Sequence, residues 1–372
     1  MRDGTRVVKA GLPATAQGQP FLPGPTFAGT YAFSGDLGTS AYVYGRYHNP
    51  TWSNFERGIG ELEGGPTVVY SSGMAAITAV LATTLNPGTK DNVVVMPSDG
   101  YYGARALADG YFGSRGIEVR KAPTPGGAQA NLLEGATLLW LESPSNPGLD
   151  VCDISEVARL AHAKGTLVAV DNTTATVLGQ RPLALGADFS VSSDSKGLTG
   201  HEDLMMGHVA ARDQAWADKL LAFRTQQGGV PGPMEVWLAH RSLATLQVRL
   251  ERQCKTALEV AKLLAGRSDV HSVRYPGLPQ DSSYALASRQ MSYFGPIVGF
   301  VLDGKEQAEA FLKECKVIVS ATSFGGVHST AERRARWGGD AIPPGFVRFS
   351  AGCEDTLDVV EDVRQALDAI KV

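Results

Sequence analysis

Neither a disulfide framework nor a cysteine-based zinc site is indicated by this chain, because its cysteines are few and far apart. The four are Cys152, Cys254, Cys315 and Cys353, and no CxxC pair occurs. Zinc sites and disulfide-rich domains need several cysteines at short, regular spacings. Dispersed thiols are instead typical of a protein that works in the reducing cytoplasm, which is the location we expect.

Other features are missing too, and each absence excludes a class of protein. The 34 Lys and Arg against 38 Asp and Glu give a net charge of −4, so no basic field for nucleic acid is present. No uncharged apolar run approaches the roughly 20 residues of a membrane span, and the N-terminus lacks the apolar core of a signal peptide. The histidines have no ligand-like spacing. We therefore expect no nucleic acid, membrane or metal partner.

The phosphate-binding glycine motifs of nucleotide enzymes are also absent. No GxxxxGK[ST] loop occurs, and no GxGxxG follows a predicted strand. Gly58-Ile59-Gly60 lies within a predicted helix and lacks the third glycine. These absences argue against a nicotinamide-dependent dehydrogenase.

What the chain does contain, between residues 67 and 210, is an alternation of short apolar runs with helical patterns. This alternation predicts an α/β domain with a mainly parallel sheet. After residue 210 the pattern predicts a smaller α+β domain, with a helix over 234–264 long enough to connect the two. Its other predicted elements are helices at 215–224, 306–313 and 357–370 and strands at 270–275, 297–302, 317–321 and 346–349.

Lys196 is the strongest candidate for a reactive residue. It follows the apolar segment 187–191, and two hydroxyls, Ser193 and Ser195, precede it. A lysine in a desolvated pocket has a lowered pKa, so its neutral amine can attack a carbonyl. Asp171 ends another apolar run and can pair with a protonated pyridine nitrogen. A lysine, a strand-end aspartate and phosphate-binding hydroxyls are what pyridoxal phosphate requires, although SDSK alone also fits a surface loop.

Further candidates follow predicted strands, where ligands of α/β sheets collect. Gly73 stands at a strand–helix turn suited to phosphate, though Ser and Gly also serve there as simple caps. Tyr101 could stack on a ring or merely anchor its loop, and Asn146 follows the next strand. Arg348, inside an apolar strand, grips a carboxylate if it points inward but is an ordinary surface arginine if it points outward.

Taken together, these motifs resemble the Cys/Met-metabolism enzymes that depend on pyridoxal phosphate, and within that family the bacterial cystathionine γ-lyases. The likeness covers about residues 40–368, with the motifs in the family's order and spacing. They are YGRYHNPT (44–51), SSGMAA (71–76), DGYYG (99–103), ESPSNP (142–147), VDNT (170–173), SDSKGLTGH (193–201), ATSFGGVHS (321–329) and VRFSAG (347–352).

The resemblance implies an aspartate aminotransferase-like fold (fold type I) and a role for each candidate. Three residues would be catalytic: Lys196 would carry the cofactor and move protons, Asp171 would pair with the ring nitrogen, and Tyr101 would stack on the ring. The phosphate would be held by Gly73, Met74, Ser193 and Ser195, with Tyr44 and Arg46 reaching it from a neighbouring subunit. The substrate would be bound by Arg348, Asn146, Ser323 and Thr322.

The resemblance also implies a domain plan and an assembly. Residues 1–50 would be an arm contacting the neighbouring subunit, 51–235 the cofactor-binding α/β domain and 236–372 the C-terminal domain. The expected assembly is a homotetramer, a dimer of dimers in which two subunits share each active site.

The implied reaction is γ-elimination of L-cystathionine to L-cysteine, 2-oxobutyrate and ammonia. The alternatives are cystathionine γ-synthase-type γ-replacement on O-acyl-homoserine, methionine γ-lyase activity, and a non-catalytic binding protein on the same fold. Three positions depart from the family pattern: Tyr102 replaces a glycine, Ser195 a threonine, and Thr322 a glutamate associated with the distal end of the substrate. Gly103 stands where methionine γ-lyases tend to have cysteine, which counts against that activity.

Overall fold

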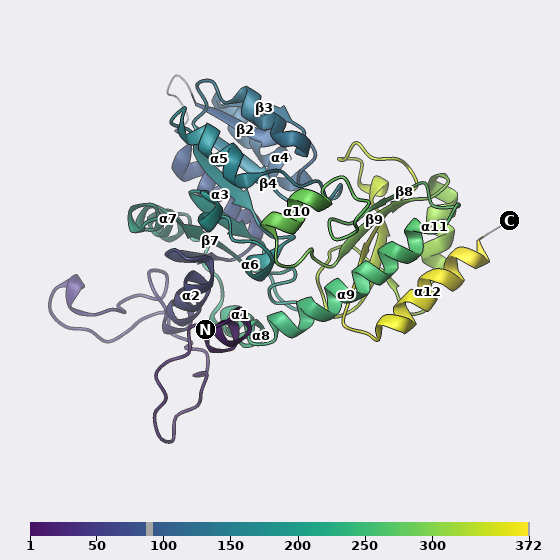
Figure 1. The fold of residues 1–372 in the computed structure, drawn as a ribbon. Helices are drawn as coiled ribbons and strands as arrows, with labels where there is room; N and C mark the ends of the chain where they lie inside the picture. The colour runs from purple at the N-terminus through teal and green to yellow at the C-terminus, as the bar shows by residue number, and fades with distance from the viewer. Residues whose placement is uncertain (87–91, 371–372) are drawn as a thin grey trace.

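The computed structural model describes residues 1–86 and 92–370, and it shows two domains, each built on its own sheet (Figure 1). The larger sheet has seven strands in the order β1-β7-β6-β5-β4-β2-β3. These are Thr67–Tyr70 (β1), Val93–Pro97 (β2), Glu118–Ala122 (β3), Leu138–Glu142 (β4), Leu167–Asp171 (β5), Phe189–Ser192 (β6) and Gly207–Ala211 (β7).

This sheet is mainly parallel, as the alternation of strands and helices predicted. The exception is β7, which runs antiparallel to both β1 and β6. The loop from β6 to β7 therefore returns beside the strand it leaves, and Lys196 lies in that loop. Strand β3 was not predicted: it is a partly exposed edge strand with three charged residues, so it has no apolar run to reveal it.

Helices cover both faces of the large sheet (Figure 1). One apolar cluster joins one face to α3 and α7, and another joins the opposite face to α5. The helices of this part of the chain are Asp3–Lys9 (α1), Pro50–Glu63 (α2), Gly73–Thr84 (α3), Tyr102–Leu107 (α4), Ile154–His162 (α5), Thr176–Gly179 (α6), Gln214–Gln227 (α7) and Pro233–Leu243 (α8).

The second domain carries five strands in the order β10-β11-β12-β9-β8. Its helices α9, α11 and α12 share one apolar cluster with the sheet. The elements are Leu246–Ala265 (α9), Ser272–Arg274 (β8), Tyr284–Gln290 (α10), Ile297–Val301 (β9), Gly304–Glu314 (α11), Val319–Ser320 (β10), Thr330–Arg333 (β11), Phe346–Ser350 (β12) and Thr356–Ala369 (α12).

The single helix predicted over 234–264 is wrong, because α8 and α9 are separate. Thr245 leaves the helical conformation (φ −104°, ψ 2°), and its hydroxyl donates to Ser242 O. A threonine that bonds the backbone locally in this way competes with helix continuation. α8 packs on α2, while α9 runs on along the second domain (Figure 1).

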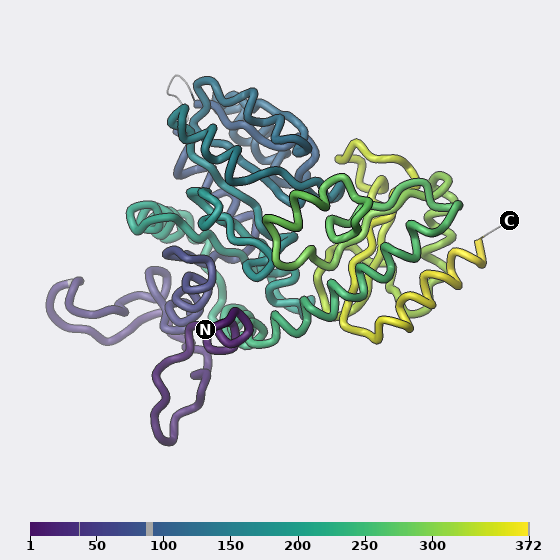
Figure 2. Tube along the Cα trace, in the orientation of Figure 1, coloured from purple at the N-terminus to yellow at the C-terminus, as the bar shows by residue number. Residues whose placement is uncertain are grey.

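The predicted N-terminal arm contains an α-helix, α1, that its composition did not predict. α1 packs on α2 through Val7, and between α1 and α2 the chain leaves the body in two extended loops (Figure 2). Phe21, Phe27 and Phe33 on these loops are exposed. Among the helices of the described residues, none is long and apolar enough to cross a membrane.

Candidate functional site

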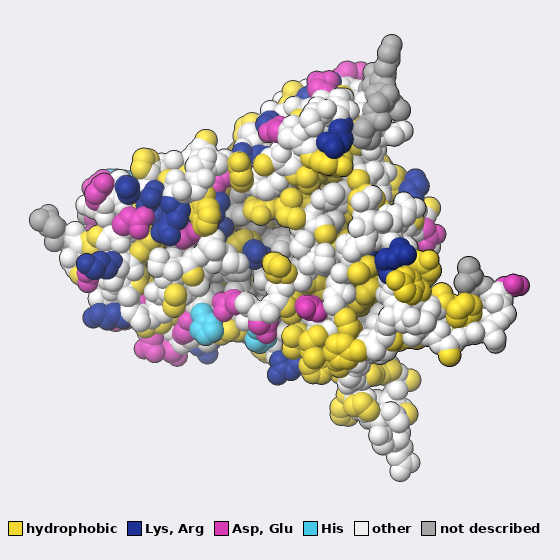
Figure 3. Space-filling view, turned by 180° about the vertical axis from the view of Figure 1, so that it is seen from behind, with side chains coloured by type: hydrophobic (Ala, Val, Ile, Leu, Met, Phe, Trp, Pro, Cys, Tyr) yellow, Lys and Arg dark blue, Asp and Glu magenta, His cyan; other side chains and the backbone are white. Residues whose placement is uncertain are grey.

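A cavity of about 320 Å³ lies where the ends of the large sheet's strands meet the second domain. The face of the molecule seen in Figure 3 is hollowed near its centre, with basic side chains inside the hollow. Most of the residues predicted to form a site line this cavity. They are Gly73, Met74, Tyr101, Asn146, Asp171, Ser193, Ser195, Lys196, Thr322, Ser323 and Arg348.

Lys196 lines the cavity from a tight turn after β6. Its backbone N–H donates to Ser193 O (3.1 Å), and its carbonyl accepts from Gly200 N (2.9 Å). Burial lowers the pKa of the amine, the nearby Arg348 lowers it further, and Asp171 opposes both. Burial thus favours the neutral amine, which is the form that attacks a carbonyl.

Asp171 and Glu142 end adjacent parallel strands and are directly paired in the sheet register. Burial raises the pKa of both carboxyls. The charge of Asp171 raises the pKa of Glu142 further, well above its ordinary value. Lys196 and two hydrogen bonds involving Thr173 act in the opposite direction on Asp171. A cation placed against Asp171 would favour its charged form.

Glu142 is a site residue that the sequence motifs did not single out. One carboxylate oxygen accepts from Tyr101 N (2.6 Å) and the other from Asn146 N (2.8 Å). It therefore fixes the backbone of two candidate residues at once. Its position in the sequence could have predicted this role, because Glu142 is the last residue of an apolar strand, as Asp171 is.

The N-terminus of α3 forms one wall of the cavity. Ser72 caps this helix by accepting from Ala75 N (3.1 Å). A Cβ at Gly73 would lie 2.5 Å from Cβ of Ser193, so only glycine allows the helix and the Lys196 loop to approach this closely. Ser195 exchanges hydrogen bonds with the backbone of Met206, which fixes the loop from its other side.

Arg348 points inward and is 3% exposed, which excludes a surface role. Its guanidinium donates to Asn146 Oδ1 (2.7 Å), Ser323 O (3.0 Å) and Glu332 Oε1 (2.5 Å). Burial lowers its pKa to about 10, which still leaves it charged at neutral pH. Thr322 contacts the same Glu332 oxygen at 3.4 Å. A buried cation held on one side by fixed partners is suited to bind an anion on the other.

Tyr44 and Arg46 lie outside the cavity lining in this single chain. Tyr44 is exposed, and Arg46 donates to Thr225 O (2.6 Å) while stacking near Tyr44 and Tyr47. The bridge between Thr30 and Tyr44 closes the second extended loop. A single chain does not test whether Tyr44 and Arg46 contact a neighbouring subunit, so that contact stays a prediction.

A buried polar triad connects the Lys196 loop to β7 and α2, and no sequence motif predicted it. His208 Nδ1 lies 2.7 Å from Asp194 Oδ1, and Nε2 lies 3.2 Å from Glu63 Oε1. All three side chains are buried. Although burial itself lowers the pKa of the imidazole, the two carboxylates raise it to about 10, so it is cationic at neutral pH.

We expect His208→Gln to destabilise the protein by about 3 kcal/mol near pH 6, because removing one partner strands buried charge. The folded-state pKa is raised above the ordinary 6.5, so this stabilisation is complete below pH 6.5 and fades as pH rises toward 10. Urea unfolding of both proteins between pH 6 and 10 measures the difference. The exposed His328→Gln serves as control, and a difference that grew with pH would contradict the account.

The donor set fits pyridoxal phosphate. The N-terminus of α3, with Ser193 beside it, matches the phosphate. Asp171 is buried at the edge of the cavity, where a cationic ring nitrogen would stabilise its charged form, and Lys196 lies within the same cavity. In the part of the chain that the structure describes, no three His, Cys, Asp or Glu side chains gather as metal ligands.

Comparisons with known proteins agree with this chemistry. A family model described as Cys/Met metabolism PLP-dependent enzyme matches residues 5–368. A Streptomyces coelicolor protein provisionally assigned as a cystathionine γ-lyase is 53% identical over 371 residues, which cover 98% of this chain and 93% of that protein. Cystathionine γ-synthase of Mycobacterium tuberculosis is 35% identical, with 98% and 96% covered. A solved structure of a cystathionine γ-lyase from Micromonospora echinospora superposes with a TM-score of 0.91 at 36% identity, covering 99% of both chains.

Proposed function

Since the chain belongs to the Cys/Met-metabolism enzymes that depend on pyridoxal phosphate, we propose that it is a carbon–sulfur lyase acting on L-cystathionine. The γ-carbon–sulfur bond would break, and with one water the products are L-cysteine, 2-oxobutyrate and ammonia. The observation that carries the proposal is the convergence of Lys196, Asp171 and Arg348 on one cavity in a chain 53% identical to a provisional cystathionine γ-lyase.

The residues of this chain would divide the work as follows. Arg348, preorganised by Asn146, would bind the substrate α-carboxylate and thereby hold the Cα–H bond in the reactive orientation. Pyridoxal phosphate supplies the electron sink for the carbanion left at Cα. Lys196 would take the proton from Cα and then serve at Cβ, where γ-elimination needs a second proton removed.

Asp171 and Tyr101 would act on the cofactor ring from two directions. Asp171 would hold a positive charge at the ring nitrogen, and Tyr101 would stack on the ring face. Gly73, Met74, Ser193 and Ser195 would hold the phosphate. This division of roles is the one that the family's motifs imply for these positions.

Gly103 favours this reading over methionine γ-lyase activity. A Cβ at position 103 would lie 2.6 Å from the Tyr101 ring. The cysteine typical of methionine γ-lyases would therefore require Tyr101 to move. γ-Replacement remains the second candidate, because two relatives that are 35% identical to this chain are cystathionine γ-synthases.

The experiment that tests the proposal is product identification with purified holoenzyme. L-Cystathionine, O-succinyl-L-homoserine with L-cysteine, and L-methionine are supplied separately. We expect 2-oxobutyrate and cysteine from cystathionine to be the fastest reaction. Pyruvate and homocysteine would indicate a β-lyase, and faster cystathionine synthesis than cleavage would indicate a γ-synthase.

We also propose a homotetramer, a dimer of dimers, in which Tyr44 and Arg46 complete the phosphate site of a neighbouring subunit. The exposed aromatic residues of the extended loops support an intersubunit role, because such apolar surface is normally covered (Figure 3). Residues 1–50 would then be the intersubunit arm, with domains at 51–235 and 236–372. We place the enzyme in the cytoplasm, which cell fractionation would test.

Mixing Arg46→Ala subunits with Lys196→Ala subunits should restore part of the activity that each variant lacks alone. A shared site implies this result, because one of the two sites in a hybrid dimer regains both residues. Activity is measured after subunit exchange, which labelled subunits verify. Verified exchange without any recovery would mean that the arm serves its own chain.

A further inference from the structure

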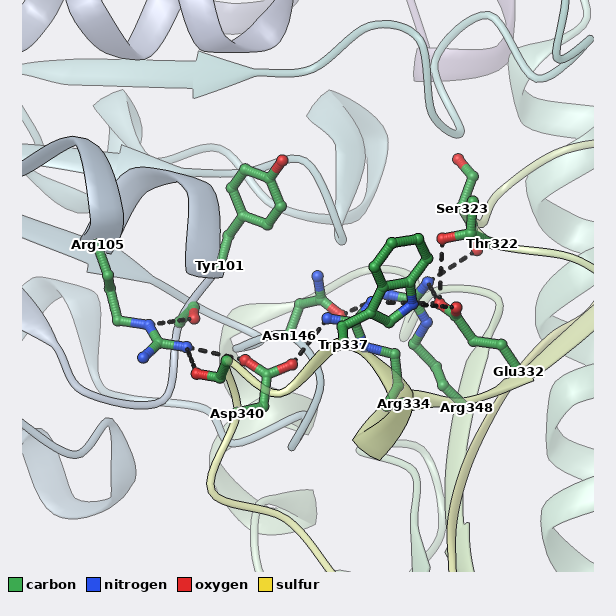
Figure 4. A network of polar contacts seen from close by, with 12 residues as sticks. Tyr101, Arg105, Asn146, Thr322, Ser323, Glu332, Arg334, Trp337, Asp340 and Arg348 are labelled. Carbon is green, nitrogen blue, oxygen red and sulfur yellow. Dashed lines mark hydrogen bonds and ion pairs between the residues drawn. The ribbon is translucent and has the colours of Figure 1, made fainter. Parts of the chain in front are cut away.

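The second-domain wall of the cavity carries a basic residue that the function described so far does not use. Arg334 follows strand β11 and lines the same cavity as Lys196 and Arg348. Figure 4 shows it in a chain of ion pairs that runs from Arg105 through Asp340 and Arg334 to Glu332. Its side chain is 11% exposed.

Two carboxylates hold the Arg334 guanidinium in place. Nη2 lies 2.7 Å from Asp340 Oδ2, and Nη1 lies 3.3 Å from Glu332 Oε1. Asp340 is itself fixed by Arg105 of the first domain at 2.8 Å. An arginine held in this way loses little further conformational freedom when it binds a ligand.

The guanidinium of Arg334 nevertheless keeps unused hydrogen-bonding capacity. Its Nε is buried and has no hydrogen-bond partner among the described residues. The bonds to Asp340 and Glu332 engage only part of its N–H donors. A buried donor without a partner is unfavourable, and a carboxylate is the group that pairs with an arginine fork most strongly.

The charges on this wall select an anion over a cation. Among the described lining residues the carboxylates are Glu142 and Asp171, which both belong to the first domain, whereas the second domain contributes Arg334 and Arg348. Thr322 and Ser323, which also line this wall, are uncharged. Glu332 lies outside the lining and already accepts from Arg348, Arg334 and Trp337.

We propose that Arg334 binds a second carboxylate of the substrate, at the end of its side chain remote from Cα. The preferred ligands are amino acids whose side chain ends in a carboxylate, or carries one near its end, rather than amino acids with an apolar or purely cationic side chain. This inference deepens the proposed function and rests on it for the assignment of the α-carboxylate to Arg348. L-Cystathionine, which carries a carboxylate at its distal end, belongs to the preferred class.

The test uses ligands without a leaving group, so it does not depend on γ-elimination. L-2-Aminoadipate and L-norleucine have the same chain length and differ in the terminal carboxylate, and L-lysine carries a terminal ammonium. Each is titrated into the holoenzyme, and the dissociation constant is read from the change in cofactor absorbance. We expect aminoadipate to bind about 10- to 100-fold more tightly than norleucine, and lysine to bind most weakly.

Arg334→Gln should abolish the preference for aminoadipate while leaving norleucine binding within about threefold. Arg334→Lys should restore part of it, because the charge returns without the fork. Arg336→Gln, on the same helical turn but outside the cavity lining, is the matched control and should retain the preference.

Two outcomes would overturn the inference. Equal losses for aminoadipate and norleucine in Arg334→Gln would show that Arg334 supports the fold or the α-carboxylate site. An unchanged preference for aminoadipate in Arg334→Gln would show that another group binds the terminal carboxylate. If the wild-type enzyme distinguishes these ligands as expected but releases no 2-oxobutyrate from cystathionine, the proposed reaction fails and the Arg334 site stands.

Discussion

Lys196→Ala should lower kcat for cystathionine cleavage by at least about 10⁴-fold, because one side chain both carries the cofactor and moves two protons. The fall should be in kcat rather than in the stability of the protein. The lysine is partly buried with a lowered pKa, so its removal relieves an unfavourable burial. Steady-state kinetics and urea unfolding together measure both effects.

Lys255→Ala is the matched control for this variant. Lys255 is exposed on α9, and its removal should leave kcat and the cofactor spectrum unchanged. The Lys196→Ala protein should still retain pyridoxal phosphate weakly through the phosphate contacts, without the absorbance of lysine-bound cofactor. A variant with more than about a tenth of wild-type kcat would exclude Lys196 as the reactive lysine.

Asp171→Asn should lower kcat/KM by about 10²- to 10³-fold, the usual effect of removing one preorganised electrostatic partner. The amide keeps the shape of the carboxylate but cannot hold a positive charge at the ring nitrogen. The cofactor-free protein should instead be as stable as the wild type or more so. Both carboxyls are buried, and the charge of Asp171 raises the pKa of Glu142, so removing that charge relieves the repulsion on Glu142.

A variant that loses activity without losing stability would show that Asp171 has a functional role and not a structural one. Asp99→Asn is a suitable control, because Asp99 is a partly buried carboxylate outside the cavity lining that accepts hydrogen bonds from Thr124. Its removal should lower stability and leave kcat/KM within about threefold. A loss of stability in Asp171→Asn equal to that of Asp99→Asn would assign Asp171 to the fold alone.

The sequence predicted the two-domain α/β architecture because the strands that matter most are fully buried. Strands β4 and β5, buried on both faces, read as continuous apolar runs, and their charged last residues mark the strand ends. The same logic located Asp171 and the loop that carries Lys196. Parallel strands bring their ends to one edge, so the candidates Gly73, Tyr101 and Asn146 were expected together, and the structure places them around one cavity.

What could not be predicted depends on contacts between residues distant in sequence. Glu142 has a role because Tyr101 and Asn146 turn their backbone N–H groups toward it, which no local pattern shows. His208 has a structural role because it pairs with Glu63, which is distant in sequence. The guanidinium of Arg334 is held in place by Asp340, which lies in the loop that follows. Edge strand β3 and the break between α8 and α9 were missed for a different reason. β3 has no apolar run that would predict a strand, and at the break the apolar helical pattern outweighs the local effect of Thr245.

The attachment of the cofactor to Lys196 can be located by treating the holoenzyme with borohydride, which converts a lysine–cofactor bond to a stable secondary amine. Digestion and mass spectrometry then locate the modified peptide. We expect to find the cofactor on Lys196, in the loop between β6 and β7, and on no other lysine. Cofactor attached to a different lysine, or none retained by a protein shown to be folded, would contradict it.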